Sequence, residues 1–262
     1  MSYWKTLTGR WGSSAGETDE IRMDSVTNTI QTITDPHHKI HSGNHFYVEG
    51  YTSLDIDGTL YIKLVTPNTG YWSHFVWLLG STGILTTTFD EDATGGMTGG
   101  AVLTTHANNR NTNCWVGRHT GSDDEATVLT DSGQAWTIDA LIGYQVFNTA
   151  DGSSGVITDN TADTVTVAAL AGGTGNDFDT GDEYEINKSR VVITSGVITC
   201  TDYLQRINNN SFFGAKIIDG EKSREDELIL KQNTTYCRSF TSGTESNVVS
   251  YKASWYEHTN LN

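Results

Sequence analysis

Four histidines lie within nine residues near the start of the chain, and imidazole is a common metal ligand. They are His37, His38, His41 and His45. Three of them are spaced four residues apart and would share a face only in a helix, but Pro36 and the Ser-Gly-Asn stretch at 42–44 argue against a helix. In a strand, His37 and His41 share one face and His38 lies on the other. We therefore predict a polar strand or subunit contact at His37, His38 and His41, with a metal site as the alternative.

Two groups of acidic residues carry the oxygen ligands that a hard cation such as Ca²⁺ prefers. One is Asp90-Glu91-Asp92, and the other is Asp177, Asp179 and Asp182. Neither group has the spacing and central glycine of a calcium-binding loop. The glycine-rich stretch 95–100 lacks the Lys-Ser/Thr ending of a phosphate-binding loop. We interpret these acids as surface residues, with calcium binding as the alternative, and we predict neither a metal nor a cofactor.

No group of residues in the sequence has a pattern typical of catalysis. A glycoside hydrolase, for example, needs two carboxylates that face each other across one cleft, and no motif selects such a pair. We therefore predict that the protein is not an enzyme.

The chain has three cysteines, Cys114, Cys200 and Cys237. An odd number at wide spacing is not a disulfide framework. This pattern favours buried thiols, and one disulfide with one free thiol is the alternative.

The charge of the chain argues against two classes of partner. Its 262 residues include 32 Asp and Glu against 16 Lys and Arg, a formal net charge of −16. Binding to a phosphate backbone or to an anionic lipid surface needs clustered Lys and Arg, so we expect no nucleic acid and no membrane as partner. The first residues lack the apolar segment of a signal peptide, and we expect synthesis in a cytoplasm.

Strand patterns occupy most of the chain and predict an all-β protein. In Thr59–Val65, the alternate residues Leu60, Ile62 and Leu64 are apolar, which is the period of a half-buried strand. A strand predicted over 247–258 alternates in the same way. Large aromatic side chains that can anchor a sheet core follow the first strand: Tyr71, Trp72, Phe75 and Trp77.

Residues 1–35 are predicted to form an N-terminal arm. Trp4 and Trp11 lie there among Gly, Ser and Thr, a composition that would leave both aromatic side chains poorly covered. Exposed aromatic residues of this kind are typical of subunit contacts. We predict that Trp4 and Trp11 contact another subunit; the alternative is that they fold back on their own domain.

The composition changes sharply after Arg118. No Lys or Arg occurs between Arg118 and Lys188, whereas residues 121–187 contain thirteen Asp and Glu, so the rest of the chain carries only −3 of the net charge. This stretch has five strand-like segments of its own, at 126–129, 144–147, 155–158, 164–167 and 183–186. We predict an acidic inserted β domain at 119–188 within a discontinuous parent domain made of 36–118 and 189–262.

Several stretches of the parent domain resemble a family of tailed-phage virion proteins, the capsid decoration or cement proteins. The stretches are Asp24–Ile33, His37–Phe46, Tyr71–Phe75, Arg224–Tyr236 and Lys252–His258. The resemblance covers about residues 20–115 and 190–262. The inserted segment separately resembles a small β module of phage tail and fibre proteins, in LTDSGQAW, DGSSGVIT and NDFDTGDEYEI. Typical relatives of the parent domain lack this insert.

The resemblance implies a jelly-roll-like β-sandwich that forms an oligomer, often a trimer, on the outside of a capsid. The expected partners are the major capsid protein and other copies of the chain, the expected location is the virion exterior, and no catalytic residues carry over. The alternative is a tail or head-fibre component that binds host-surface glycans through exposed aromatic residues. Its candidates are Trp72, Trp77 and Trp115, which core packing would equally explain.

Overall fold

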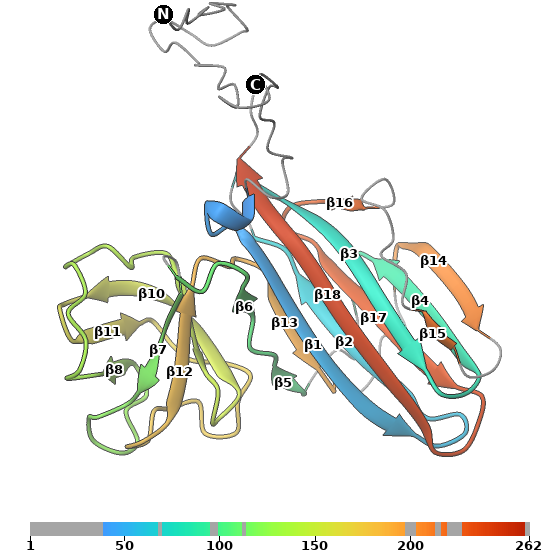
Figure 1. The fold of residues 1–262 in the computed structure, drawn as a ribbon, viewed down its shortest axis with the longest axis horizontal. Helices are drawn as coiled ribbons and strands as arrows, with labels where there is room; N and C mark the ends of the chain where they lie inside the picture. The colour runs from blue at the N-terminus through green and yellow to red at the C-terminus, as the bar shows by residue number, and fades with distance from the viewer. Residues whose placement is uncertain are drawn as a thin grey trace, which may run out of the picture. The chain divides into compact units, whose positions relative to one another are not determined.

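The computed structural model describes residues 39–67, 70–94, 99–111, 114–196, 203–212, 216–218 and 227–259. These residues are almost entirely β, with eighteen strands in three antiparallel sheets (Figure 1). Among the described residues, none belongs to a helix with the length and apolar character needed to span a bilayer. The predicted all-β fold class is therefore confirmed.

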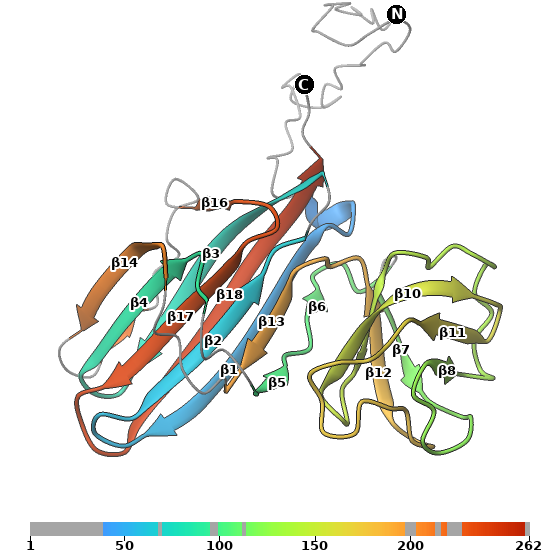
Figure 2. The same cartoon turned by 180° about the vertical axis from the view of Figure 1, so that it is seen from behind.

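Two of the sheets form a sandwich. Sheet one has the order β15 (Lys216–Ile218), β3 (Tyr71–Ser81), β18 (Asn247–Thr259), β1 (His45–Leu54) and β6 (His106–Ala107), and β16 (Leu228–Leu230) also pairs with β3. Sheet two has the order β14 (Gln205–Phe212), β4 (Leu85–Glu91), β17 (Thr235–Ser242), β2 (Thr59–Val65), β13 (Val192–Ser195) and β5 (Ala101–Val102). Sheet one is in front in Figure 1, and sheet two is in front in Figure 2, which views the molecule from the other side.

The order of the strands is that of a jelly roll. The chain alternates between the sheets from β1 to β4, and from β14 to β18 it alternates again except that the consecutive strands β15 and β16 both belong to sheet one. The first strand pairs with the last, β1 with β18, and the pairing nests inward through β2 with β17, β3 with β15 and β16, and β4 with β14. This nested antiparallel pairing defines the fold and confirms the predicted jelly-roll-like sandwich.

Strand alternation fills the space between the two sheets with aromatic and aliphatic side chains. Ile62 and Leu64 are buried, as the period of two predicts, and so are Val249, Ala253 and Trp255 on β18. The rings of Phe75 and Trp255 stack at 4.8 Å between centroids. Trp255 is fully buried, and burial of such large rings supplies much of the stability of a core.

The third sheet lies within the connection from β4 to β14. It has the order β7 (Cys114–Arg118), β12 (Glu183–Asn187), β9 (Gln145–Asn148), β10 (Ser153–Asn160), β11 (Thr164–Val167) and β8 (Val128–Thr130). We call residues 114–187 the insert. It has a hydrophobic cluster of its own around Trp136, Phe178 and Ile186. Five of its strands overlap the predicted segments, and the sixth, β7, lies in the range predicted for the parent domain.

The expectation of no helix around the histidine cluster is wrong. Residues 39–41 are helical, and the next residues form the cap of the helix. Gly43 has a φ of 71°, its N–H bonds the carbonyl of Ile40, and the N–H of Asn44 bonds the carbonyl of Lys39, each at 3.0 Å. These two bonds make a Schellman motif, in which Gly is favoured because of its positive φ. The residues that argued against a helix therefore end one.

The cysteines follow the alternative interpretation. Cys237 is disulfide-bonded and fully buried, whereas Cys114 is a free, half-buried cysteine. The prediction of three thiols is therefore wrong for Cys237.

Candidate functional site

Most of the residues predicted to contact the capsid or another subunit lie outside the described residues: Trp4, Trp11, His37 and His38. His41 is described. It is exposed at the end of the short helix, and its carbonyl accepts a hydrogen bond from Asn109 Nδ2 at 2.9 Å. The contact at these five residues stays a prediction.

A network of polar side chains lies on the outer side of sheet one. Tyr256 of β18 is the register partner of His74 of β3, and His258 follows two residues later on the same face. Glu227, next to β16, completes the group: His74 Nδ1 lies 2.6 Å and the Tyr256 hydroxyl 2.8 Å from Glu227 Oε1. The Nε2 atoms of His74 and His258 are 2.8 Å apart.

The network is packed but not sealed from solvent. The side chain of His74 is 12% exposed and that of Glu227 14% exposed. The ring of His74 stacks on Tyr256 at 4.5 Å and lies 4.8 Å from the ring of His258. A histidine held by a carboxylate is the unit that proteins use for proton transfer and for metal binding.

A second buried cluster surrounds Glu185 of β12. Its carboxylate receives bonds from Arg110 to both oxygens at 2.8 Å and from His106 Nδ1 at 2.8 Å. Burial alone would raise the pKa of Glu185, but the bonds from His106 and Arg110 outweigh it and lower the pKa to about 2. Burial and the nearby Glu185 charge raise the pKa of Cys114 to about 12, so its thiol is not a nucleophile at neutral pH.

The acidic residues proposed as calcium ligands are arranged differently from the prediction. Asp177 and Asp179 gather with Asp124, within 4.8 Å of one another. Asp182 instead accepts bonds from Asn148 Nδ2 at 2.7 Å and from the Asp179 N–H. Partial desolvation and the neighbouring carboxylates raise the pKa of Asp177. Exposed acids that repel one another in this way do not by themselves make a cation site.

Two of the acids at 90–92, Asp90 and Glu91, form ion pairs. Asp90 pairs with Arg206 at 2.8 Å, and Glu91 pairs with Lys231 at 2.5 Å and accepts a bond from the Tyr236 hydroxyl. Both Asp90 and Glu91 are buried. Their interpretation as surface acids is therefore wrong, and both already have cationic partners.

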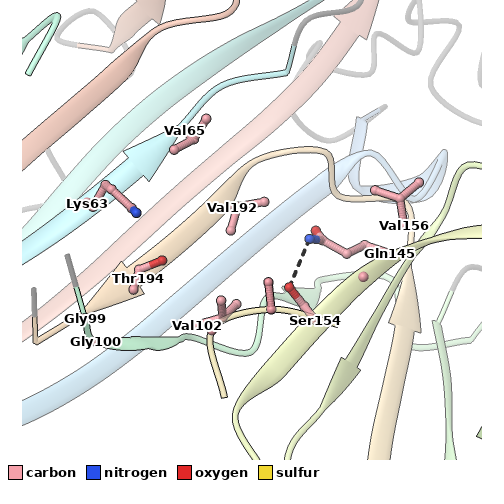
Figure 3. A pocket seen from close by; sticks show the side chains of 13 residues that line it. Lys63, Val65, Gly99, Gly100, Val102, Gln145, Ser154, Val156, Val192 and Thr194 are labelled. Carbon is pink, nitrogen blue, oxygen red and sulfur yellow. Dashed lines mark hydrogen bonds between the residues drawn. The ribbon is translucent and has the colours of Figure 1, made fainter. Parts of the chain in front are cut away.

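A cavity of about 380 Å³ lies between strands β2, β5 and β13 of the sandwich and strands β9 and β10 of the insert (Figure 3). Its wall is mostly apolar, formed by valines such as Val65 of β2 and Val192 of β13, and the same two strands contribute Lys63 and Thr194. Gln145 donates to Ser154 Oγ at 3.3 Å, and its Oε1 has no hydrogen-bond partner among the described residues. The cavity can accommodate a small, mainly apolar group with one hydrogen-bond donor.

Two of the three tryptophans proposed for glycan stacking belong to cores. Trp77 packs against the sandwich core and meets Phe89 edge-on at 6.2 Å. Trp115 packs against the insert core beside Tyr144. Trp72 is half-buried on β3. Trp77 and Trp115 are therefore better explained by packing than by sugar binding.

Comparison with known proteins gives little that bears on this site. No protein-family model matches the chain, and a search of curated proteins finds no match. Nine solved chains match by structure. One is from the structure of infectious bursal disease virus, Gx strain, with 9% sequence identity over 83% of this chain and 81% of that chain and a TM-score of 0.22. A likeness at this TM-score carries no argument about function.

Proposed function

We propose that this chain is a virus structural protein, and more specifically a decoration or cement protein on the outside of a tailed-phage capsid. The observation that carries the proposal is the distribution of charge on the fold. A jelly roll carries, in the loop from β4 to β14, an insert whose residues 121–187 hold thirteen acids and no Lys or Arg. Jelly rolls occur in capsid proteins, lectins and cupins, so the fold alone does not select the function.

The charge distribution suits a protein that adheres through one part and projects another. The chain outside residues 121–187 carries only −3, so it can approach a capsid lattice without strong repulsion. The insert repels like copies of itself and stays in solvent. The arm and the edge strands would clamp neighbouring subunits, with Trp4 and Trp11 as anchors.

Cement activity needs no chemical reaction. A protein that binds only the assembled shell stabilises it by mass action, and many copies make weak individual contacts effective. The partners in this proposal are the major capsid protein and two further copies of the chain in a homotrimer. The protein is then not an enzyme and works on the virion exterior.

The test is to remove the protein from virus particles and add the purified chain back. Stripped particles should lose resistance to heat and internal pressure, and the added chain should restore it. A double variant Trp4→Ala/Trp11→Ala should restore less, whereas Tyr51→Ala, which removes an exposed aromatic side chain of β1, serves as the matched control. Unchanged resistance after stripping would remove the cement function, and a handful of copies per particle would favour a tail fibre.

A further inference from the structure

The two imidazole rings at the end of sheet one are oriented by their own hydrogen bonds. His258 Nδ1 lies 2.7 Å from the carbonyl oxygen of Thr259, which only accepts, so Nδ1 carries a hydrogen. His74 Nδ1 lies 2.6 Å from Glu227 Oε1. The single hydroxyl hydrogen of Tyr256 is directed to the same carboxylate oxygen at 2.8 Å, so His74 Nδ1 must supply its own hydrogen to Glu227.

With both Nδ1 atoms protonated, neutral imidazoles leave a lone pair on each Nε2. These two Nε2 atoms face each other at 2.8 Å, where two lone pairs repel unless an electrophile lies between or beside them. The Nδ1 atom of each ring is held by an acceptor, which is the Glu227 carboxylate for His74 and the Thr259 carbonyl for His258. Metal-binding histidines are held in this way, because the second bond fixes the tautomer and makes the ligand nitrogen more basic.

We propose that His74 and His258 bind a divalent transition-metal ion through their Nε2 atoms, with Glu227 as the positioning residue. At a metal–nitrogen distance of about 2.0–2.1 Å, two nitrogens this close subtend an angle of about 85–90°. That is the angle between adjacent ligands of Ni²⁺ or Cu²⁺ in tetragonal sites, whereas tetrahedral Zn²⁺ would need the nitrogens about 3.3 Å apart. A small rotation of His258 at the end of β18 points both lone pairs at one ion, and water fills the other positions.

The site joins segments that are distant in the sequence. His74 and His258 are 184 residues apart, and Glu227 is 153 residues from His74. A bound ion would therefore connect β3 to β18 directly and stabilise the folded state by mass action. Metal binding must displace any proton shared by the two rings, so it should weaken in acid. The inference does not depend on the proposed capsid function.

The experiment uses the full chain, freed of metal with a chelator and titrated with Ni²⁺ in a calorimeter at pH 7.5. We expect saturable binding of one ion per chain, a rise in Tm with Ni²⁺ that the chelator reverses, and weaker binding at pH 5.5. Zn²⁺ should bind more weakly than Ni²⁺. An absorption spectrum typical of Ni²⁺ with nitrogen ligands should appear with the binding.

Three variants assign the site. His258→Gln, at a partly exposed position near the strand end, should abolish binding without loss of the fold, which circular dichroism checks. Glu227→Gln should weaken binding by about 10–100-fold, the usual effect of removing the group that orients a ligand. His106→Ala, which removes an imidazole bound to Glu185 instead, is the matched control and should bind as the wild type does.

Four outcomes would overturn the proposal. They are no stoichiometric Ni²⁺ binding by the wild type, unchanged binding by His258→Gln, stronger binding of Zn²⁺ than of Ni²⁺, and loss of binding in a His37→Ala/His38→Ala variant with His74 and His258 intact. The last result would place the metal at the histidine cluster of residues 37–45 instead. A proton shared between His74 and His258 with no Ni²⁺ bound would be an instance of the first outcome.

Discussion

The sandwich and the insert are both antiparallel β structures, but different interactions hold them. In the sandwich, β18 runs for thirteen residues and pairs along most of its length with both β1 and β3 over a core of stacked aromatic rings. The longest strand of the insert, β10, has eight residues. Long loops of the insert are instead fixed by Asp and Asn side chains that bond backbone N–H groups.

Asp151 shows how the insert uses its acids. One carboxylate accepts hydrogen bonds from three successive backbone N–H groups, at 2.7 Å from Thr174, 2.6 Å from Gly175 and 3.0 Å from Asn176. Burial opposes ionisation of Asp151, but these bonds lower its pKa. The high charge of the insert is therefore partly structural, because carboxylates replace the backbone partners that a longer strand would provide.

The two regions also treat a buried glutamate differently. Glu185 lies against Arg110 and His106 and has a lowered pKa. Glu257, inside the sandwich end of β18, is fully buried, and its distance to Arg190 is 3.5 Å. Burial therefore raises the pKa of Glu257 despite bonds from the N–H groups of Arg190 and Val191. The charged form is therefore favoured at Glu185 and disfavoured at Glu257.

The largest loss of stability should come from substitutions in the aromatic cores. Trp255→Ala removes a fully buried ring stacked on Phe75 and should cost about 3–5 kcal/mol, with hydrogen exchange rising mainly in the sandwich. Trp136→Ala, the matched change in the insert core, should raise exchange mainly in the insert. Peptide-resolved hydrogen exchange measures both. If either variant loosened the two regions equally, the comparison between them would fail.

The second-largest loss of stability should come from disrupting the cluster of Glu185 with Arg110 and His106. Glu185→Gln removes the charge that Arg110 and His106 surround and should cost about 2–3 kcal/mol, at or below the low end of the roughly 3–5 kcal/mol for a broken buried pair, because the Arg110 side chain is 48% exposed. Urea unfolding measures the loss. Lys252→Ala is the control, because its pair with Glu49 is on the surface and should contribute at most about 0.5 kcal/mol. Equal losses in both variants would show that burial of Glu185 does not matter.

As the pH falls, the insert should lose stability before the sandwich does. The loss should be no larger than that caused by Glu185→Gln. The pKa of Glu185 is about 2 in the folded state, against the ordinary value of 4.5 that we take for the unfolded chain. Its contribution to folding stability is therefore complete above pH 4.5 and is lost as the pH falls toward 2. Asp151 acts in the same direction. Glu257 has the opposite sign, since protonation favours its folded form. Hydrogen exchange at pH 5 and pH 3 tests this, and earlier loosening of the sandwich would contradict it.

The smallest effect should come from a single loop of the insert. Asp151→Ala removes the acceptor of three N–H bonds and should cost about 1–3 kcal/mol, with faster exchange at Thr174–Asn176. Asp159→Ala, an exposed acid of β10, should change stability by less than about 0.5 kcal/mol. A similar effect of both variants would mean that the acids of the insert act only through net charge.

The features that could be predicted from the sequence are those set by short-range patterns, namely strands and the side chains that they bury. Alternation placed Ile62, Leu64 and Trp255 in the core, and turn residues marked five strands of the insert. It misjudged residues 42–44, because Ser, Gly and Asn are compatible both with a loop and with the cap of a helix. It also placed Asp182 in the acidic group in place of Asp124, because folding of the loops, and not spacing, decides which acids meet.

The histidine network could not be predicted from the sequence. His74, Glu227 and His258 come together only through the register of β3 with β18 and β16, and register between strands more than 150 residues apart leaves no local signal. The one available signal was that His74 and His258 each occupy an outward position in an alternating strand. That pattern favours a polar surface residue as much as a ligand.

An image of the intact virus particle at a resolution that traces this chain would test the central claim most directly. We expect the sandwich to be seated on the outer surface of the major capsid lattice at a repeating position, with the insert directed away from the shell. Density for the chain confined to the tail, or no density on the particle at all, would contradict the proposed role.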